Sequence, residues 1–222
     1  MSRPAHRSKL IRIVAVAGSV AAAVSAAYLG LGRRWCLTWG ATAEEVHRVM
    51  PGDELLVHPD VMSTRAVRIA AAPSAVWPWL MQMGSGKGGV YTYDWIENLV
   101  GLNMHSVDVV LPQFQDRKVG DVEVLGKSGP RMRVEVLDPQ RAMVLHSEDG
   151  NWVWTFGLYP ESGGTVLISR NRIATPGAAA SVRAFYTLIM EPGSLIMERK
   201  MLLGIKQRAE ALASSQAGAG KP

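Results

Sequence analysis

The chain is poor in the residues that build covalent cross-links, metal centres and nucleophilic sites. Its 222 residues include one cysteine and five histidines. The single cysteine, Cys36, excludes an intrachain disulfide and cannot form a thiolate metal site by itself. The sequence has no Gly-x-Ser-x-Gly motif, and Cys36 lies outside the segment with domain-like patterning. Acyl transfer by a serine or cysteine nucleophile is therefore poorly supported.

Charged residues are also scarce, at 19% of the chain, whereas hydrophobic residues make up 48%. This composition can bury a full core and excludes a globally disordered chain. The formal net charge is +5, but it depends on basic residues that flank one apolar stretch, namely Arg3, Arg7, Lys9, Arg12, Arg33 and Arg34. This distribution indicates a membrane surface rather than nucleic acid. No stretch interleaves basic and aromatic residues as a base-stacking platform does, so no nucleic-acid partner is expected.

The apolar stretch at 13–32 contains no charged residue and has about the ~20-residue length that spans a hydrocarbon core. One interpretation is an uncleaved anchor, with the domain outside the cytoplasm. The other is a signal peptide cleaved after the small residues at 24–26, which would give a secreted protein. The apolar run continues past that site, which favours the anchor. Trp35 and Trp39 then follow where interfacial aromatic residues are expected.

Patterning divides the chain into four parts. They are a basic tail with the apolar segment (1–34), a connector (35–63), a folded domain (64–213) and a small polar tail expected to be disordered (214–222). Thr42 and Glu45 form the pattern of a capping box, which predicts a short connector helix ending near Val49. Cys36 is interpreted as a small apolar residue at the membrane edge, and palmitoylation is the alternative.

From residue 64 onward the hydrophobic periodicity is that of an α+β domain. Strands are predicted at 64–70, around 122–124, 132–136 and 143–145, at 152–158 and at 166–173, and helices at 73–84 and 93–100. A long amphipathic helix from about residue 178 closes the chain, and Pro192 is expected to kink or break it. This order predicts a helix-grip fold, in which a curved antiparallel sheet surrounds a long C-terminal helix. A ligand cavity is expected between them.

Several segments resemble one family. The runs RAVRIAAAPSAVW (65–77), WLMQMG (79–84) and MERKMLLGIKQRAE (197–210) are similar to START-like proteins of the SRPBCC superfamily. The segment 88–108 resembles a bacterial branch that also carries an N-terminal apolar segment and a Trp-Gly-x-Thr stretch, here at 39–42. The resemblance covers about residues 39–212 and implies the helix-grip fold with a ligand cavity. It does not imply a reaction, because the superfamily contains lipid carriers, hormone binders and cyclases.

The most apolar strand face is formed by Trp152, Trp154, Phe156 and Leu158. In a helix-grip fold the inner face of the sheet is both core and cavity wall, so these side chains are candidates for either role. The candidate ligand-binding residues are Trp77, Trp152, Trp154, Phe156, Tyr186 and Arg170. Arg170 shares a strand face with Arg172, which indicates cross-strand ion pairs on the solvent side. Binding of an anionic ligand head group by Arg170 is the alternative.

His105 and Asp108, with Glu97 nearby, offer groups for acid–base chemistry or for the start of a metal site. The favoured interpretation is structural, with hydrogen bonds that fix the shape of a loop. No second histidine stands at metal-ligand spacing, so no metal and no cofactor are expected. The glycine-rich loop 84–89 is not a phosphate-binding loop, because Met81 replaces the first glycine and Gly88 the metal-binding hydroxyl.

Three functions remain open on these grounds. The favoured one is the binding of a small hydrophobic ligand, lipid-like or aromatic, at or near a membrane. The second is a cyclase-type or dehydratase-type enzyme that uses His105 with Asp108 or Glu97. The third is a membrane-associated interaction protein with a vestigial cavity. An enzyme requires titratable groups that face the cavity, and the volume of a pocket separates the first function from the third.

Overall fold

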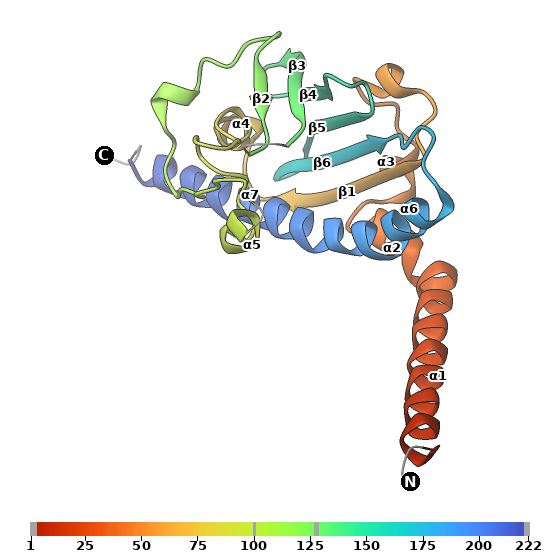
Figure 1. Ribbon diagram of the computed structural model, residues 1–222. Helices are drawn as coiled ribbons and strands as arrows, with labels where there is room; N and C mark the ends of the chain where they lie inside the picture. The colour runs from red at the N-terminus through yellow and green to blue at the C-terminus, as the bar shows by residue number, and fades with distance from the viewer. Residues whose placement is uncertain (1–3, 100, 127–128, 220–222) are drawn as a thin grey trace.

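The chain folds around one antiparallel sheet and one long helix. The computed structural model describes residues 4–99, 101–126 and 129–219. The sheet has six strands in the order β1-β6-β5-β4-β3-β2, so the first strand pairs with the last, and it curves around helix α7 (Figure 1). The strands are β1 (Val61–Ile69), β2 (Val122–Val124), β3 (Arg131–Asp138), β4 (Ala142–Ser147), β5 (Trp152–Glu161) and β6 (Gly164–Ile173).

The helices precede, interrupt and close this sheet. They are α1 (Pro4–Ala27), the π-helical turn η1 (Tyr28–Gly32), α2 (Arg33–Leu37), α3 (Ala43–His47), the 3-10 turn η2 (Asp53–Leu56), α4 (Pro73–Met81), α5 (Asp94–Leu99), the 3-10 turn η3 (Pro112–Phe114), α6 (Ala180–Phe185), the π-helical turn η4 (Tyr186–Met190) and α7 (Glu191–Ala219). The order of one strand, two short helices, antiparallel strands and a long closing helix confirms the predicted α+β helix-grip fold.

The inner face of the sheet, which faces α7, carries the main core. The two-residue period of a strand places Phe156 and Leu158 on this side of β5. Helix α7 presents Leu202 and Ile205 to them, and both of these side chains are completely buried in the same cluster. Trp154 packs against that cluster from its margin. The predicted packing of the sheet around the closing helix is confirmed.

The outer face of the sheet is covered by the connector. Met50 packs with Ala66 of β1 and Ile168 of β6 in a second buried cluster. The predicted capping box begins α3, where the Glu45 amide donates to Thr42 Oγ1 over 3.2 Å and the Thr42 amide donates to Glu45 Oε2 over 2.7 Å. The connector therefore packs as a layer of the same folded unit as the strands.

Some boundaries differ from those expected. Helix α3 ends at His47 rather than near Val49, and β1 begins at Val61, within the predicted connector. Helix α5 ends at Leu99, and Val100 of the predicted helix lies outside the described residues.

The closing helix is longer and less interrupted than the sequence indicates. The helical run α6-η4-α7 continues through Pro192, where a break was expected. Pro192 has no N–H to donate to the Leu188 carbonyl, and the wider π-helical turn η4 lies directly before it. Residues 214–219, for which disorder was expected, continue α7, and residues 220–222 lie outside the described range.

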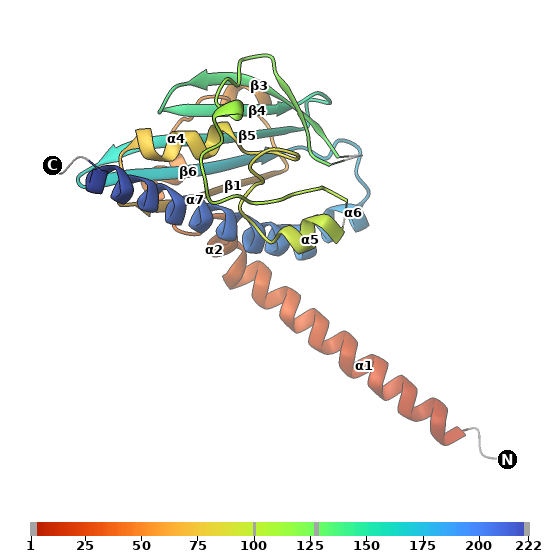
Figure 2. The same cartoon turned by 90° about the vertical axis from the view of Figure 1, so that its left-hand side faces the viewer.

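Helix α1 projects from one side of the domain (Figure 2). The 23-residue stretch Ala15–Leu37 is long and apolar enough to cross a membrane. It begins later than the predicted run 13–32 and extends beyond it, through Arg33 and Arg34, to Leu37. A signal sequence near the N-terminus passes the same test, so the structure is compatible with both the anchor and the signal peptide. Arg3 lies outside the described residues.

The residues after the apolar segment are partly integrated into the domain. Trp35 is 60% exposed, as expected of an interfacial residue. Trp39 instead packs against the core, with the Arg199 guanidinium 5.2 Å from the centre of its ring. Cys36 is 2% exposed, and its Sγ lies 3.3 Å from the Glu191 carbonyl oxygen. This burial supports the interpretation of Cys36 as a packed small residue, since palmitoylation requires an accessible thiol.

Candidate functional site

The tryptophan stripe of β5 lies on the inner face of the sheet. The rings of Trp152 and Trp154 stack with their centroids 5.6 Å apart and an angle of 18° between their planes. The Trp154 and Phe156 rings follow at 4.8 Å and 46°. Phe156 is completely buried, whereas both tryptophans are half-buried. The stripe therefore leads from the margin of the grip into its core.

Hydrogen bonds fix both indole rings. Trp152 Nε1 donates to Asn171 Oδ1 over 2.8 Å, and Trp154 Nε1 donates to Ser169 Oγ over 2.9 Å. Both acceptors belong to β6, the neighbouring strand. The polar edge of each ring is satisfied within the protein, and the Trp154 ring lies between those of Trp152 and Phe156. The parts of the two indole rings that remain exposed are therefore the surfaces left for apolar contact.

A buried ionic group lies beside the stripe. Arg65, on the inner face of β1, is completely buried and forms an ion pair with Glu198 of α7. Its other nitrogens donate to Ser194 Oγ and to the Cys36 carbonyl, each over 3.0 Å. Asn171 Nδ2 donates to Glu198 Oε1 over 3.2 Å, which links this group to the tryptophans. Burial raises the pKa of Glu198, and the contact with Arg65 opposes that rise.

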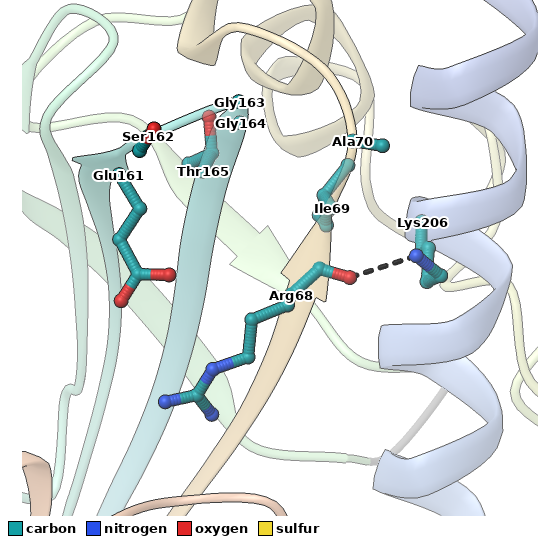
Figure 3. Close-up of a pocket in the computed structure, with 9 residues that line it drawn as sticks. All are labelled: Arg68, Ile69, Ala70, Glu161, Ser162, Gly163, Gly164, Thr165 and Lys206. Atoms are coloured by element: carbon teal, nitrogen blue, oxygen red, sulfur yellow. Dashed lines mark hydrogen bonds between the residues drawn. The ribbon is translucent and has the colours of Figure 1, made fainter.

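The interior between the sheet and α7 is filled by side chains. Phe156, Leu202 and Ile205 are each 0% exposed. A pocket of about 250 Å³ lies instead at the β5-β6 turn, where Lys206 Nζ donates to the Arg68 carbonyl over 2.8 Å (Figure 3). A groove of about 570 Å³ lies between α1 and η4. Neither of these two pockets is lined by a residue of the tryptophan stripe.

The remaining ligand-binding candidates lie apart from the stripe. Arg170 is on the outer face of the sheet and is 2% exposed beneath the connector. Its guanidinium donates to carbonyl oxygens of Glu45, Val46 and Arg48, and it pairs with Asp53. Neither the predicted solvent-side ion pair nor a ligand head group describes this position, because the connector's own groups occupy the guanidinium.

Two aromatic candidates lie on helices. Trp77, on α4, is half-buried against the main core. Tyr186, on η4, is also half-buried, and its ring meets that of Phe185 edge-on with 6.5 Å between centroids. The structure thus brings together Trp152, Trp154 and Phe156, whereas Tyr186 lies on η4 and contacts Phe185.

The proposed acid–base residues do not assemble into one site. His105 is exposed, and Asp108 is exposed and pairs with Arg208 over 2.7 Å. Glu97 is buried, and this burial raises the pKa of its carboxyl group. No hydrogen bond or ion pair joins these three residues in the part of the chain that the structure describes. Within that part there is also no cluster of His, Cys, Asp and Glu side chains that could hold a metal ion.

Local polar contacts explain why these residue types occur in this segment. Asp94 accepts hydrogen bonds from the Ser106 amide and hydroxyl over 2.7 and 2.6 Å. Arg208 of α7 donates to the Val107 carbonyl over 2.7 Å. The first two bonds join the loop after α5 to that helix, and the third joins it to the closing helix. The glycine-rich loop is fixed in a similar way, by an ion pair of Lys87 with Glu123.

Two functional groups were missed by sequence reasoning, the Arg65–Glu198 pair and the buried Arg117. Arg65 could have been noticed, because it shares a strand face with the apolar Val67 and Ile69. Its partner could not, since 133 positions separate the two residues. Arg117 is 6% exposed, and its surroundings lower its pKa by desolvation, which the nearby Glu123 carboxylate opposes.

No protein-family model and no curated protein matches this chain. Solved structures of similar fold include the KanY protein ms6282, at 18% identity over 69% of this chain and 99% of that one, with a TM-score of 0.44. The Polyketide_cyc-like protein Cgl2372 from Corynebacterium glutamicum has 19% identity over 71% and 92%, with a TM-score of 0.33. The AHSA1-like protein from Aeromonas hydrophila has 17% identity over 68% and 93%, with a TM-score of 0.38. At these values no function and no residue role is transferred.

Proposed function

We propose that this protein binds a small apolar, lipid-like molecule at the tryptophan end of the grip, close to a membrane. The observation that supports the proposal is the pair of half-buried, stacked rings of Trp152 and Trp154 on the inner face of the sheet. In this proposal the ligand contacts the exposed parts of the two rings at the margin of the grip. Phe156 belongs to the core behind them, because it is completely buried.

The hydrogen bonds of the two indoles favour binding. A side chain that is already fixed loses less conformational entropy when a ligand arrives, and ordering a free side chain costs about 0.5–1.5 kcal/mol. The bonds to Ser169 and Asn171 hold both rings in place before any ligand binds. Aromatic faces also suit lipid chains and aromatic molecules alike. The proposal therefore covers an apolar ligand class and requires no charged head group.

Native mass spectrometry of the full chain, purified from its own host, tests this function. The wild-type protein is expected to retain a bound apolar molecule. Trp154→Ala should lose it, because one of the two stacked rings is gone and Trp152 loses its support. Trp154→Phe keeps a ring without the indole N–H and should retain it in part, which serves as the matched control. A folded Trp154→Ala variant with the same adduct as wild type would contradict the proposal.

A second candidate function is a membrane-bound interaction protein whose grip is closed. The filled space between Phe156, Leu202 and Ile205 favours it, since neither of the two pockets described above opens at the stripe. Absence of any adduct from folded wild-type protein would favour this function. The enzyme alternative is not proposed, because its three residues do not form one site. His105 is exposed, Asp108 pairs with Arg208, and Glu97 is buried.

A further inference from the structure

The apolar N-terminal segment enters the domain as a continuous helix. Helices α1 and α2 are joined by the helical turn η1, so the described chain is helical from Pro4 to Leu37. Glu191, at the start of α7, accepts hydrogen bonds from Tyr28 over 2.9 Å and from Arg33 over 2.8 Å at each carboxylate oxygen. Because the end of the segment is bonded to the domain, the side of the domain that surrounds α1 must lie at the membrane surface if α1 spans the membrane.

That side of the domain carries exposed apolar side chains. In both views α2, α5, α6 and the first half of α7 lie on the side from which α1 leaves (Figures 1 and 2). We call the exposed apolar residues of these elements, and of the turn η4 that joins α6 to α7, the anchor-side face: Trp35, Trp95, Leu99, Val182, Phe185, Ile189, Met190 and Ile196. The most exposed are Leu99 at 80% and Trp95 at 70%. Exposed large apolar side chains on one side of a domain are typical of an interaction surface.

The α6-η4 part of this face has the pattern of an interfacial helix. Val182, Phe185 and Ile189 recur at helical spacing on one side, and all three are exposed. Residues 180–190 contain no acidic residue, and Arg183 among them is exposed. An apolar stripe with basic charge beside it suits the boundary between acyl chains and anionic head groups.

The groove between α1 and η4 points to the same occupant. Its volume is about 570 Å³, and it is lined by Ala17, Val20, Ala21, Val24, Ser25, Tyr28, Leu188 and Ile189. Six of these residues belong to the stretch Ala15–Leu37 that is able to span a membrane. In a bilayer, lipid chains surround this part of α1 and reach the groove from the side.

We propose that the anchor-side face lies on the lipid bilayer, with α6-η4 inserted at the level of the head groups as a second membrane contact beside α1. The grip would then be held with its long helix against the membrane. This inference extends the membrane-proximal part of the proposed function, but it does not depend on whether the tryptophan stripe binds a ligand.

Site-specific fluorescence of the full chain in lipid vesicles tests the proposal. Phe185→Cys labelled with an environment-sensitive fluorophore is expected to show blue-shifted emission that spin-labelled lipid quenches several-fold. Arg141→Cys, in the exposed turn between β3 and β4, is the matched control and should show neither effect. Cys36 is 2% exposed and should remain unlabelled.

Two results would overturn the proposal. If the label at 185 is no more quenched than the label at 141, the face does not touch lipid. This includes a blue shift without quenching, which would mean that protein covers the face. A mature chain that begins near residue 27, measured by intact mass, would show that α1 is removed as a signal peptide and would also overturn it. Loss of the apolar adduct in Trp154→Ala is independent of both results.

Discussion

Replacing Arg170 with methionine tests whether this arginine holds the connector on the sheet. Its side chain is 2% exposed, and Asp53, with which it pairs over 2.7 Å, is 18% exposed. The guanidinium also donates to Thr64 Oγ1 over 3.0 Å and to the carbonyl oxygens at the end of α3. Methionine retains much of the apolar volume but none of these donors, so the carbonyl groups lose their partners.

The expected loss of stability is large. A hydrogen bond to a charged group contributes about 1.5–3 kcal/mol, and breaking a buried ion pair costs about 3–5 kcal/mol. Asp53 keeps a second contact, with Arg172 over 3.3 Å, which limits the penalty for the carboxylate. We therefore expect Arg170→Met to lower the free energy of unfolding by about 3–5 kcal/mol, a large part of the ~5–15 kcal/mol typical of a folded domain.

Urea unfolding followed by circular dichroism measures this loss. Arg172→Met is the comparison, because Arg172 lies on the same face and also donates to connector carbonyl groups and pairs with Asp53, but its side chain is more exposed, at 12% against 2% for Arg170. We expect a loss of about 1 kcal/mol for Arg172→Met. If Arg170→Met unfolds at the wild-type urea concentration, the connector does not depend on Arg170. If that stable variant also loses the apolar adduct, Arg170 is a ligand contact after all.

Two further changes test the core and the loop. Leu202→Asp places an unpaired carboxylate at a completely buried position and should lower the free energy of unfolding by more than about 4 kcal/mol. The control Val119→Asp, at a 60% exposed position, should change it by less than about 0.5 kcal/mol. Equal urea midpoints for the two variants would refute the grip geometry. Burial raises the pKa of Glu97 in the folded state, so the folded state holds the proton more tightly than the unfolded state. Stability should therefore fall as pH rises from the unfolded carboxyl pKa of about 4.3 through the raised folded pKa. Glu97→Gln should lack this fall, and matching pH profiles for the two proteins would contradict the assignment.

The inner side of the fold could be predicted because its signals are local. The two-residue period around Trp154 indicates which face of the strand is turned to the core. The helical spacing of Leu202 and Ile205 does the same for the closing helix. The capping box at Thr42 likewise uses two residues three positions apart. For these elements local pattern and tertiary packing agree, which is why element order and the inner face were predicted correctly.

The outer layer could not be predicted in the same way. In the sequence, Arg170 has the pattern of a solvent-side residue. Its partners in the structure are backbone carbonyl oxygens of α3, and the sequence does not reveal such partners. A weaker signal was present in the consecutive apolar residues Val166, Leu167 and Ile168. Because successive side chains of a strand point to opposite faces, this run makes both faces of the strand apolar. Strands that are apolar on both sides are usually covered on both faces.

The site shows the same limit. His105, Asp108 and Glu97 are close in sequence, and the fold gives each a different environment: solvent, Arg208 and a buried position. Arg65 and Glu198 are distant in sequence, and the sheet and closing helix bring them into contact. Proximity along the chain was therefore a poor guide to which polar groups meet.

The buried pair also determines how the tryptophan rings can be reached. Arg65 bonds to Glu198 and Ser194 of α7, and Glu198 accepts from Asn171, the partner of Trp152. Moving the first half of α7 away from β1 would separate two buried charges, which costs several kcal/mol. A ligand at the tryptophan end is therefore not expected to enter by displacing this half of the helix.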